Sequence, residues 1–417
     1  MNQRSAKPSL PVALGERIDT TPVIDYLRPI IQQYEQRIED DARLPDELVD
    51  ILHDAGVFST LLPREYGGRE LHPVDHFDFI FELSRINGSV GWCAMIQTGG
   101  YPMVEPEVFA ELSGKKPWLT AGSHGRIGTE HRVEGGYRFT GEWRFCSGSA
   151  WAQYLTGWAK IVDDEGNPII DLVTGEEAMI DGLFAKADVT VLDEWNPMGM
   201  RGTGSGGFTV EDEFLEERFT MGADDIPDAY RDRAVYNLSG WAGQLHIAAM
   251  MLGSVQGMVD EFVKVAALRR ERFSFTNRAG RMGREQLHQI RIAEAHAEIR
   301  AVVEWARALG ARDYDAALRG ETLPYEDGVI AMQAVPLHAG RVAKEIALTL
   351  FGLAGADAVP RDSGLSRAFR DTLTGSQHTA FLEPQFQPIG QYLLSKDSPE
   401  GVHIDESFLM PLPPRGE

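Results

Sequence analysis

The sequence predicts an α+β protein with three parts, in the order helical, all-β and helical. Apolar residues recur with helical spacing from position 22 to about position 109. Near Trp118 the composition changes, and for about a hundred residues Gly, Thr, Val and Trp alternate with frequent turn pairs. Helical spacing then returns and persists. These changes divide the chain into an N-terminal helical domain, a central β domain and a C-terminal helical bundle, which cover residues 1–117, 118–222 and 223–417.

The first part opens with a polar arm that contains prolines. About 20 residues show no clear periodicity, which predicts an arm that is loose or docked on another segment. Pro45 then starts a short helix with acidic residues in its first turn, and Gly56 ends it. Residues 73–85 repeat this pattern, and an almost fully apolar helix follows at 90–97.

The middle part carries the signals of β-structure. Glu134, Gly135 and Gly136 are typical of a hairpin turn between strands at 129–133 and 137–145. Along the second strand, apolar and polar residues alternate, as they do in a strand with one buried face. This pattern is compatible with both a sandwich and a barrel.

The last part is predicted to be a bundle of four helices. A long segment at 238–272 is rich in Ala, Gly and Met, and small residues let helices approach closely, so we expect it in the bundle interior. Three more helices are predicted at 284–309, 328–351 and 366 to about 394, where prolines break the end.

Composition excludes several classes of function. The formal net charge of −23 disfavours nucleic acid and anionic membranes as partners. No apolar stretch is long enough to span a bilayer, and no secretory signal is visible. With only Cys93 and Cys146, neither a disulfide framework nor a Cys-rich zinc site is expected, no other metal motif occurs, and a reducing cytoplasm is the simplest location.

Four short segments resemble motifs of the acyl-CoA dehydrogenase superfamily, and they occur in the family's order over nearly the whole chain. They are LPREYGG at 62–68, GYRFTGEWRFCSG at 136–148, GMRGTGS at 199–205, and LFGLAG at 350–355 followed by Arg370-Asp371. The resemblance implies an acyl-CoA dehydrogenase-like fold, with an N-terminal helical domain, a central β-barrel and a C-terminal four-helix bundle.

The chain departs from the true dehydrogenases at the catalytic base. Those enzymes take an α-proton from a thioester with a carboxylate, most often a Glu about nine residues after the Arg-Asp pair. Here no acid occurs between Asp371 and Glu383, and His378 stands in the expected place. The segment at 143–148 also lacks the usual W-I-T/S-N. In both respects the chain is similar to the two-component (group D) flavin-dependent monooxygenases.

This second resemblance implies a specific chemistry. Relatives of this kind receive reduced flavin, FADH2 or FMNH2, by diffusion from a separate reductase, and with O2 they form a C4a-hydroperoxyflavin. They hydroxylate small aromatic substrates such as phenols or indoles, and they assemble as homotetramers, each a dimer of dimers. No dinucleotide fingerprint follows a strand in this chain, so we do not expect it to consume NAD(P)H alone.

Three residues are predicted to be catalytic. His378 has a side chain of near-neutral pKa that can deprotonate a phenol or polarise an indole N–H. Ser147 can hydrogen-bond the substrate or the flavin edge, and His124, one strand earlier, can point at the same cavity. The plainer interpretations are a packed bundle histidine, a turn serine and a surface loop histidine.

The resemblance also nominates residues that bind the cofactor. Arg270 and Phe273 lie in a stretch similar to the family's R-x-x-F, which reaches a flavin phosphate or pyrophosphate across a subunit interface; the plainer interpretation is a solvated helix end. The full predicted set is Trp118, Cys146, Ser147, Arg270, Phe273, Gly352 and Arg370.

Two other functions remain open from the sequence. One is a flavin dehydrogenase acting on an acyl thioester, which would need a carboxylate where His378 stands. The other is a catalytically silent scaffold or flavin carrier, which would consume no phenol or indole when given reduced flavin and O2.

Overall fold

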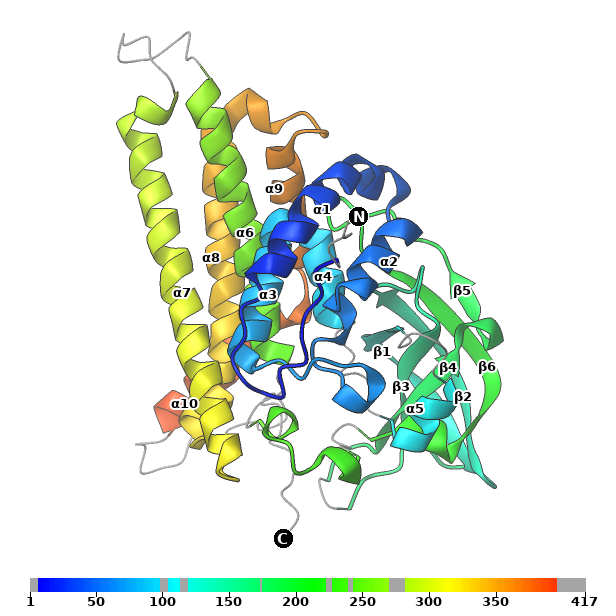
Figure 1. The fold of residues 1–417 in the computed structure, drawn as a ribbon. Coiled ribbons are helices and arrows are strands. Elements are labelled where there is room, and N and C mark those ends of the chain that lie inside the picture. The colour runs from blue at the N-terminus through cyan, green and yellow to red at the C-terminus, as the bar shows by residue number, and fades with distance from the viewer. Residues whose placement is uncertain are drawn as a thin grey trace, which may run out of the picture.

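The computed structural model describes residues 7–97, 104–112, 119–172, 175–222, 227–238, 243–269 and 282–395. A helical bundle and a curled sheet lie on opposite sides, and the N-terminal helices lie between them (Figure 1). Within the described ranges, no helix combines the length and the apolar character that crossing a membrane requires.

The N-terminal helices have the bounds α1 Thr21–Asp41, α2 Asp46–Asp54, α3 Pro73–Ile86, α4 Gly88–Ile96 and α5 Pro106–Leu112. Of these helices, α1 to α4 lie between the bundle and the sheet, and α5 packs against the sheet (Figure 1). The side chain of Asn87 caps α4 by accepting the N–H of Val90. Helices α3 and α4 pack against the bundle helix α6, so one continuous apolar core joins the first and last parts of the chain.

The N-terminal arm is docked rather than loose. Leu10 is buried, and its N–H donates to the carbonyl of Ala55 at 3.0 Å. The N–H of Ala13 donates to the carbonyl of Arg69 at 2.7 Å. Gly15 lies so close to the bundle that a Cβ on it would stand 1.8 Å from the hydroxyl of Tyr314.

The central part is a single mixed sheet with strand order β5-β6-β2-β1-β3-β4-β7. Its strands are β1 Thr120–Val133, β2 Gly136–Cys146, β3 Tyr154–Val162, β4 Met179–Ala185, β5 Thr190–Leu192, β6 Gly206–Glu216 and β7 Thr220–Met221. The expected hairpin joins β1 and β2, and Gly135 takes the left-handed conformation at its turn.

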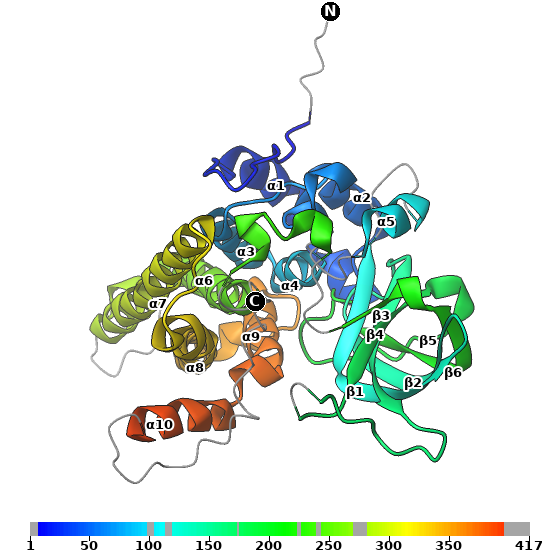
Figure 2. The ribbon, with the colours of Figure 1, turned by 90° about the horizontal axis from the view of Figure 1, so that it is seen from below.

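The sheet is not the closed barrel that the resemblance implied. It is curled (Figure 2), and it has an aromatic core of its own. Among the described residues, however, β5 and β7 remain its two edges and do not pair. The short edge strands, of three and two residues, offer too few backbone groups to close the ring.

The bundle is built from three long helices and shorter ones. They are α6 Gly243–Leu268, α7 Gln286–Leu318, α8 Ala331–Ala354, α9 Gly364–Gly375 and α10 Phe386–Ser395. Helix α6 packs against α7, α8 and α9, as its small residues predicted. The prediction of a single helix at 366–394 is wrong, because α9 ends at Gly375 and a separate helix, α10, begins at Phe386.

Candidate active site

Pairing of β2 with β6 places two serines side by side. Cys146 at the end of β2 pairs with Gly206 at the start of β6 across an irregular register. Ser147 and Ser205, the next residues outward, therefore face each other, and their hydroxyl oxygens lie 2.8 Å apart. Both are buried.

The hydrogen bonds continue from these serines in both directions. The Ser205 hydroxyl lies 2.6 Å from that of Thr203, which donates to the carbonyl of Met200 at 2.9 Å. On the other side, the indole N–H of Trp92 in α4 donates to Ser147 at 2.8 Å. The row of polar groups thus links the sheet to the N-terminal helices.

The loop before β6 is fastened to the bundle by α9. A carboxylate oxygen of Asp371 accepts the N–H of Met200 at 2.6 Å. Gly199 lies against the backbone of Arg370, where a Cβ would stand 2.1 Å from the carbonyl oxygen. Burial is the main cause that raises the pKa of Asp371, to about 6.

His378 follows α9, and its ring lies against the same tryptophan. Its ring centroid is 5.4 Å from that of Trp92, in an edge-on arrangement. The ring is open to solvent yet crowded by protein atoms, and this crowding lowers its pKa, so that it is neutral near pH 7. Phe381, packed in the space left by Gly340 of α8, anchors the turn.

The proton position on His378 follows from its role as a helix cap. Its Nδ1 accepts the N–H of Ala380 at 3.3 Å, at the start of a short 3₁₀ turn. A neutral imidazole carries one proton, so this bond assigns the proton to Nε2. The neutral side chain therefore presents a donor, where the sequence had suggested a group that accepts a proton.

Phe145 is a feature that the sequence analysis missed. It sits in the irregular register at the end of β2, with φ of 63°, and its side chain is 71% exposed. Its ring lies 6.3 Å from that of Trp195, edge to face. An aromatic residue held in a left-handed conformation and open to solvent beside Ser147 is a candidate ligand contact.

The structure places some of the other predicted residues away from this cluster. Cys146 is buried in the sheet core, and that burial raises the pKa of its thiol to about 12. Arg370 donates to Glu39 and to the carbonyls of Met198 and Arg361, so its guanidinium fastens α9 to α1. Gly352 lies exposed in α8, with open space before it.

The remaining predicted residues fall outside what the structure describes. Trp118, Arg270 and Phe273 lie outside the described residues, and the side chain of His124 in β1 is likewise not described. Of the predicted set, Ser147 and His378 both contact Trp92. Trp92, Thr203 and Ser205 were missed, and the only sequence signal for them was their place within the motif at 199–205 or within an apolar helix.

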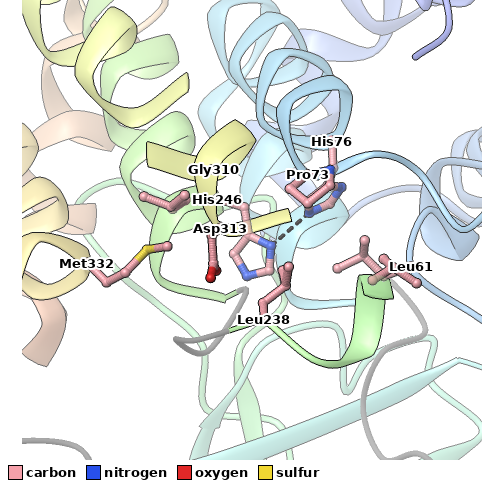
Figure 3. A pocket seen from close by; sticks show the side chains of 10 residues that line it. Leu61, Pro73, His76, Leu238, His246, Gly310, Asp313 and Met332 are labelled. Carbon is pink, nitrogen blue, oxygen red and sulfur yellow. Dashed lines mark hydrogen bonds between the residues drawn. The ribbon is translucent and has the colours of Figure 1, made fainter. Parts of the chain in front are cut away.

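A separate small cavity lies between α3, α6, α7 and α8 (Figure 3). It offers about 20 Å³ to the centre of a water-sized sphere, room for about one water molecule. There, Nε2 of His76 and Nδ1 of His246 lie 2.7 Å apart, and burial lowers the pKa of both. No cluster of His, Cys, Asp or Glu in the described part of the chain could hold a metal ion.

Comparison with protein families agrees with this architecture. The model for the acyl-CoA dehydrogenase N-terminal domain matches residues 22–107, and the model for the C-terminal domain matches residues 245–383. Together they cover more than half of the chain, and they flank the sheet. This chain belongs to the acyl-CoA dehydrogenase family.

Within this acyl-CoA dehydrogenase family, curated relatives are oxygenases. The oxygenase subunit HsaA of Rhodococcus jostii, a flavin-dependent monooxygenase, is 28% identical over 86% of this chain and 93% of its own. The indole-3-acetate monooxygenase of Pseudomonas putida is 26% identical over 84% and 87%. Among solved structures, XiaF from Streptomyces sp., in complex with FADH2 and glycerol, superposes with a TM-score of 0.80 over 90% of this chain and 94% of its own, at 21% identity.

Proposed function

We propose that this chain is the oxygenase component of a two-component flavin-dependent monooxygenase that hydroxylates an aromatic substrate. The observation that carries the proposal is the convergence of Ser147 and His378 on Trp92, where a hydroxyl from the sheet and an imidazole from the bundle meet. Relatives matched along most of their length are monooxygenases of this kind.

The residues at this place suit a flavin ring. An isoalloxazine is flat, apolar on its faces and polar along its edge, so it needs an aromatic or apolar wall and a few hydrogen-bonding groups. Phe145 offers the exposed aromatic face, and Ser147 offers the polar contact next to it. When bound in its reduced form, the flavin would supply two electrons to O2, one oxygen atom of which is transferred to the substrate while the other leaves as water. The choice between FAD and FMN stays open.

His378 favours an aromatic substrate that carries an oxygen. Because Nε2 donates, it pairs with a phenol or phenolate oxygen and stabilises negative charge there, which makes the ring carbon more nucleophilic. An indole N–H is also a donor and cannot pair with this tautomer. We therefore favour a phenol-like substrate over an indole.

An acyl-CoA dehydrogenase activity is disfavoured by the side chains near the α9 turn. Asp371, the nearest preceding acid, is buried and accepts the N–H of Met200. It is therefore committed to holding the loop at 199–205. The side chain that faces Trp92 is His378, a donor in its neutral state, and a donor cannot remove an α-proton from a thioester.

The finer expectations from the sequence form part of this proposal. They include a homotetramer with flavin shared between subunits, α6–α9 acting as a four-helix bundle, the three domains at their predicted boundaries, a cytoplasmic location and a separate reductase. Exposed apolar residues on the outer face of α7 support the tetramer.

A direct oxygenation assay tests the proposal. FMN or FAD is reduced chemically under anaerobic conditions, mixed with the protein and a panel of phenols and indoles, and then exposed to O2. We expect hydroxylated product from a phenol with at least one flavin, and no NADH oxidation by the chain alone. Absence of hydroxylated product from every substrate with both flavins would contradict the proposal.

A further inference from the structure

The three hydroxyl groups near Trp92 form a row in which every proton can be located. Three short oxygen–oxygen contacts join Met200 O to Thr203, Thr203 to Ser205, and Ser205 to Ser147, at 2.9, 2.6 and 2.8 Å. Each contact needs one proton between its oxygens, and the three side chains together own three hydroxyl protons.

The direction of the row is set at its carbonyl end. The oxygen of Met200 has no proton to give, so the proton in its 2.9 Å contact with the Thr203 hydroxyl comes from Thr203, beside two longer bonds from N–H groups to the same oxygen. Thr203 then has only lone pairs for Ser205, which must donate, and Ser205 has only lone pairs for Ser147. The single proton of Ser147 is therefore committed to Ser205, and one of its lone pairs already accepts from Trp92. What remains on Ser147 is one acceptor position.

An oxygen that can only accept a hydrogen bond pairs with N5 of reduced flavin but not with N5 of oxidised flavin. Reduced flavin carries a proton on N5 and donates there, whereas N5 of oxidised flavin is an acceptor. Two acceptors placed against each other leave a buried polar atom without a partner, which costs free energy. We propose that the flavin edge that carries N5 faces Ser147, and that Thr203 and Ser205 act as positioning residues that hold Ser147 as an acceptor and thereby select reduced over oxidised flavin. This inference rests on the proposed function.

Substitution of Thr203 by valine tests the row with little disturbance to the loop. The carbonyl of Met200 keeps two other donors, the N–H of Thr203 itself and the indole N–H of Trp195, both at 3.2 Å. Valine has nearly the shape of threonine but offers no lone pair, so the Ser205 proton is released to turn toward Ser147. Ser147 can then donate. Thr203→Ser keeps the hydroxyl and is the matched control.

The measurement is the dissociation constant of oxidised and of reduced FMN and FAD, by anaerobic ultrafiltration, for each purified variant. In Thr203→Val, we expect the ratio of the dissociation constant of oxidised flavin to that of reduced flavin to be about tenfold lower than in the wild type. The reason is that a hydrogen bond from Ser147 replaces the contact between two acceptors. The midpoint potential of bound flavin should fall by about 30 mV, the equivalent of tenfold for a two-electron couple. Thr203→Ser should match the wild type, and Ser205→Ala, which also frees the proton of Ser147, should shift in the same direction as Thr203→Val.

Two results would overturn the inference while leaving the proposed function intact. One is an unchanged ratio of the two constants in both Thr203→Val and Ser205→Ala, with flavin still bound. The other is a Thr203→Ser variant that shifts as far as Thr203→Val, which would mean that packing and not the hydroxyl is responsible. If the wild type bound neither redox state of either flavin, the proposed function would fall, and the inference with it.

Discussion

At the scale of single residues, the site is defined by which hydrogen-bonding capacity each side chain has left over. Nδ1 of His378 accepts a hydrogen bond within the turn that follows α9, and Nε2 keeps the proton. The indole N–H of Trp92 donates to Ser147, and its ring packs edge to face with that of His378. The chemical role of each group is therefore set by a neighbour and not by its own identity alone.

The role of His378 can be separated from its role as a cap. We expect His378→Ala to lower hydroxylated product by about 10²–10⁴-fold in rate while hydrogen peroxide rises, because the donor to the substrate is lost. His378→Asn keeps a capping oxygen, but its amide N–H is too short to reach the position of Nε2, so its product yield should fall equally. Product and peroxide, measured at several pH values, check this. Full yield in His378→Asn would make His378 a packing and capping residue only.

A second prediction concerns the pH dependence of stability. Glu130 in β1 is fully buried, neither of its oxygens has a hydrogen-bond partner among the described residues, and burial raises its pKa to about 7. The folded state holds this proton more tightly than the unfolded chain does. The stability that it contributes is complete below the ordinary pKa of 4.5 and is lost as the pH rises to about 7.

We therefore expect Glu130→Gln to flatten this dependence. Between pH 4.5 and pH 8, the wild type should lose about 1–3 kcal/mol more free energy of unfolding than the variant, measured by denaturant titration. Glu134→Gln, at an exposed position in the same hairpin, is the control and should behave as the wild type does. Parallel curves for the wild type and Glu130→Gln would show that Glu130 is not a buried acid.

The sequence could nominate His378 and Ser147 as candidates because each stands in a motif with a recognisable spacing. It could not reveal Trp92, which lies in an apolar helix where an aromatic residue is ordinarily part of the core. Nor could it locate the proton of His378, since the cap depends on a backbone N–H two residues away. Hydrogen-bond direction is a property of three-dimensional contacts, and spacing along the chain does not encode it.

At the scale of elements, the loop at 199–205 is the joint between sheet and helices. The N–H of Gly202 donates to Ser89 of α4, and Arg201 donates to the carbonyl of Glu39 in α1. Asp371 in α9 holds the N–H of Met200. Helices from both ends of the chain thus fix the position of Thr203 and Ser205.

Because the loop at 199–205 packs tightly against α9, substitution by alanine should lower stability at Gly199 but not at Gly390. Gly199→Ala places a methyl group 2.1 Å from the carbonyl oxygen of Arg370, so the loop must separate from α9, at a cost of about 1–3 kcal/mol. Gly390→Ala in α10 meets open space and should be neutral or stabilising, because alanine favours a helix. Thermal unfolding of both variants provides the check, and equal midpoints would contradict this description of the joint.

Helix ends were the least predictable elements. A helix was predicted at 284–309, yet α7 continues through Gly310 to Leu318. The reason is contact with α6: the missing side chain of Gly310 makes room for Leu245, since a Cβ there would lie 3.2 Å from it. The sequence alone does not distinguish a glycine that permits close helix packing from a glycine that ends a helix.

At the scale of the whole molecule, α7 presents an apolar outer face. Leu287, Ile290 and Trp305 are exposed, and Leu287 and Trp305 stand five helical turns apart on the same side. This face follows from the predicted bundle, although the sequence alone did not say which helix would be outermost (Figure 1).

We expect this face of α7 to be buried between subunits of the proposed homotetramer. Trp305→Glu should then shift the mass measured by light scattering at micromolar concentration from four chains toward two or one, because a buried charge without a partner is costly. Leu172→Glu, at a fully solvated position in the sheet part, should leave the mass unchanged. A monomeric wild type that retains activity would rule out the tetramer.

The docked arm has a consequence for how the chain is made. Gly15 fits against Tyr314, but a growing polypeptide emerges from the ribosome in order, and about 300 residues separate the two. At a translation rate of roughly 5–20 residues per second, Tyr314 is synthesised roughly 15–60 s after Gly15. Throughout that time Gly15 lacks this neighbour, whereas the carbonyls of Ala55 and Arg69, which accept N–H groups of the arm, are synthesised early. Docking of Gly15 on α7 is thus a late step of folding, and at this contact translation speed and folding are coupled.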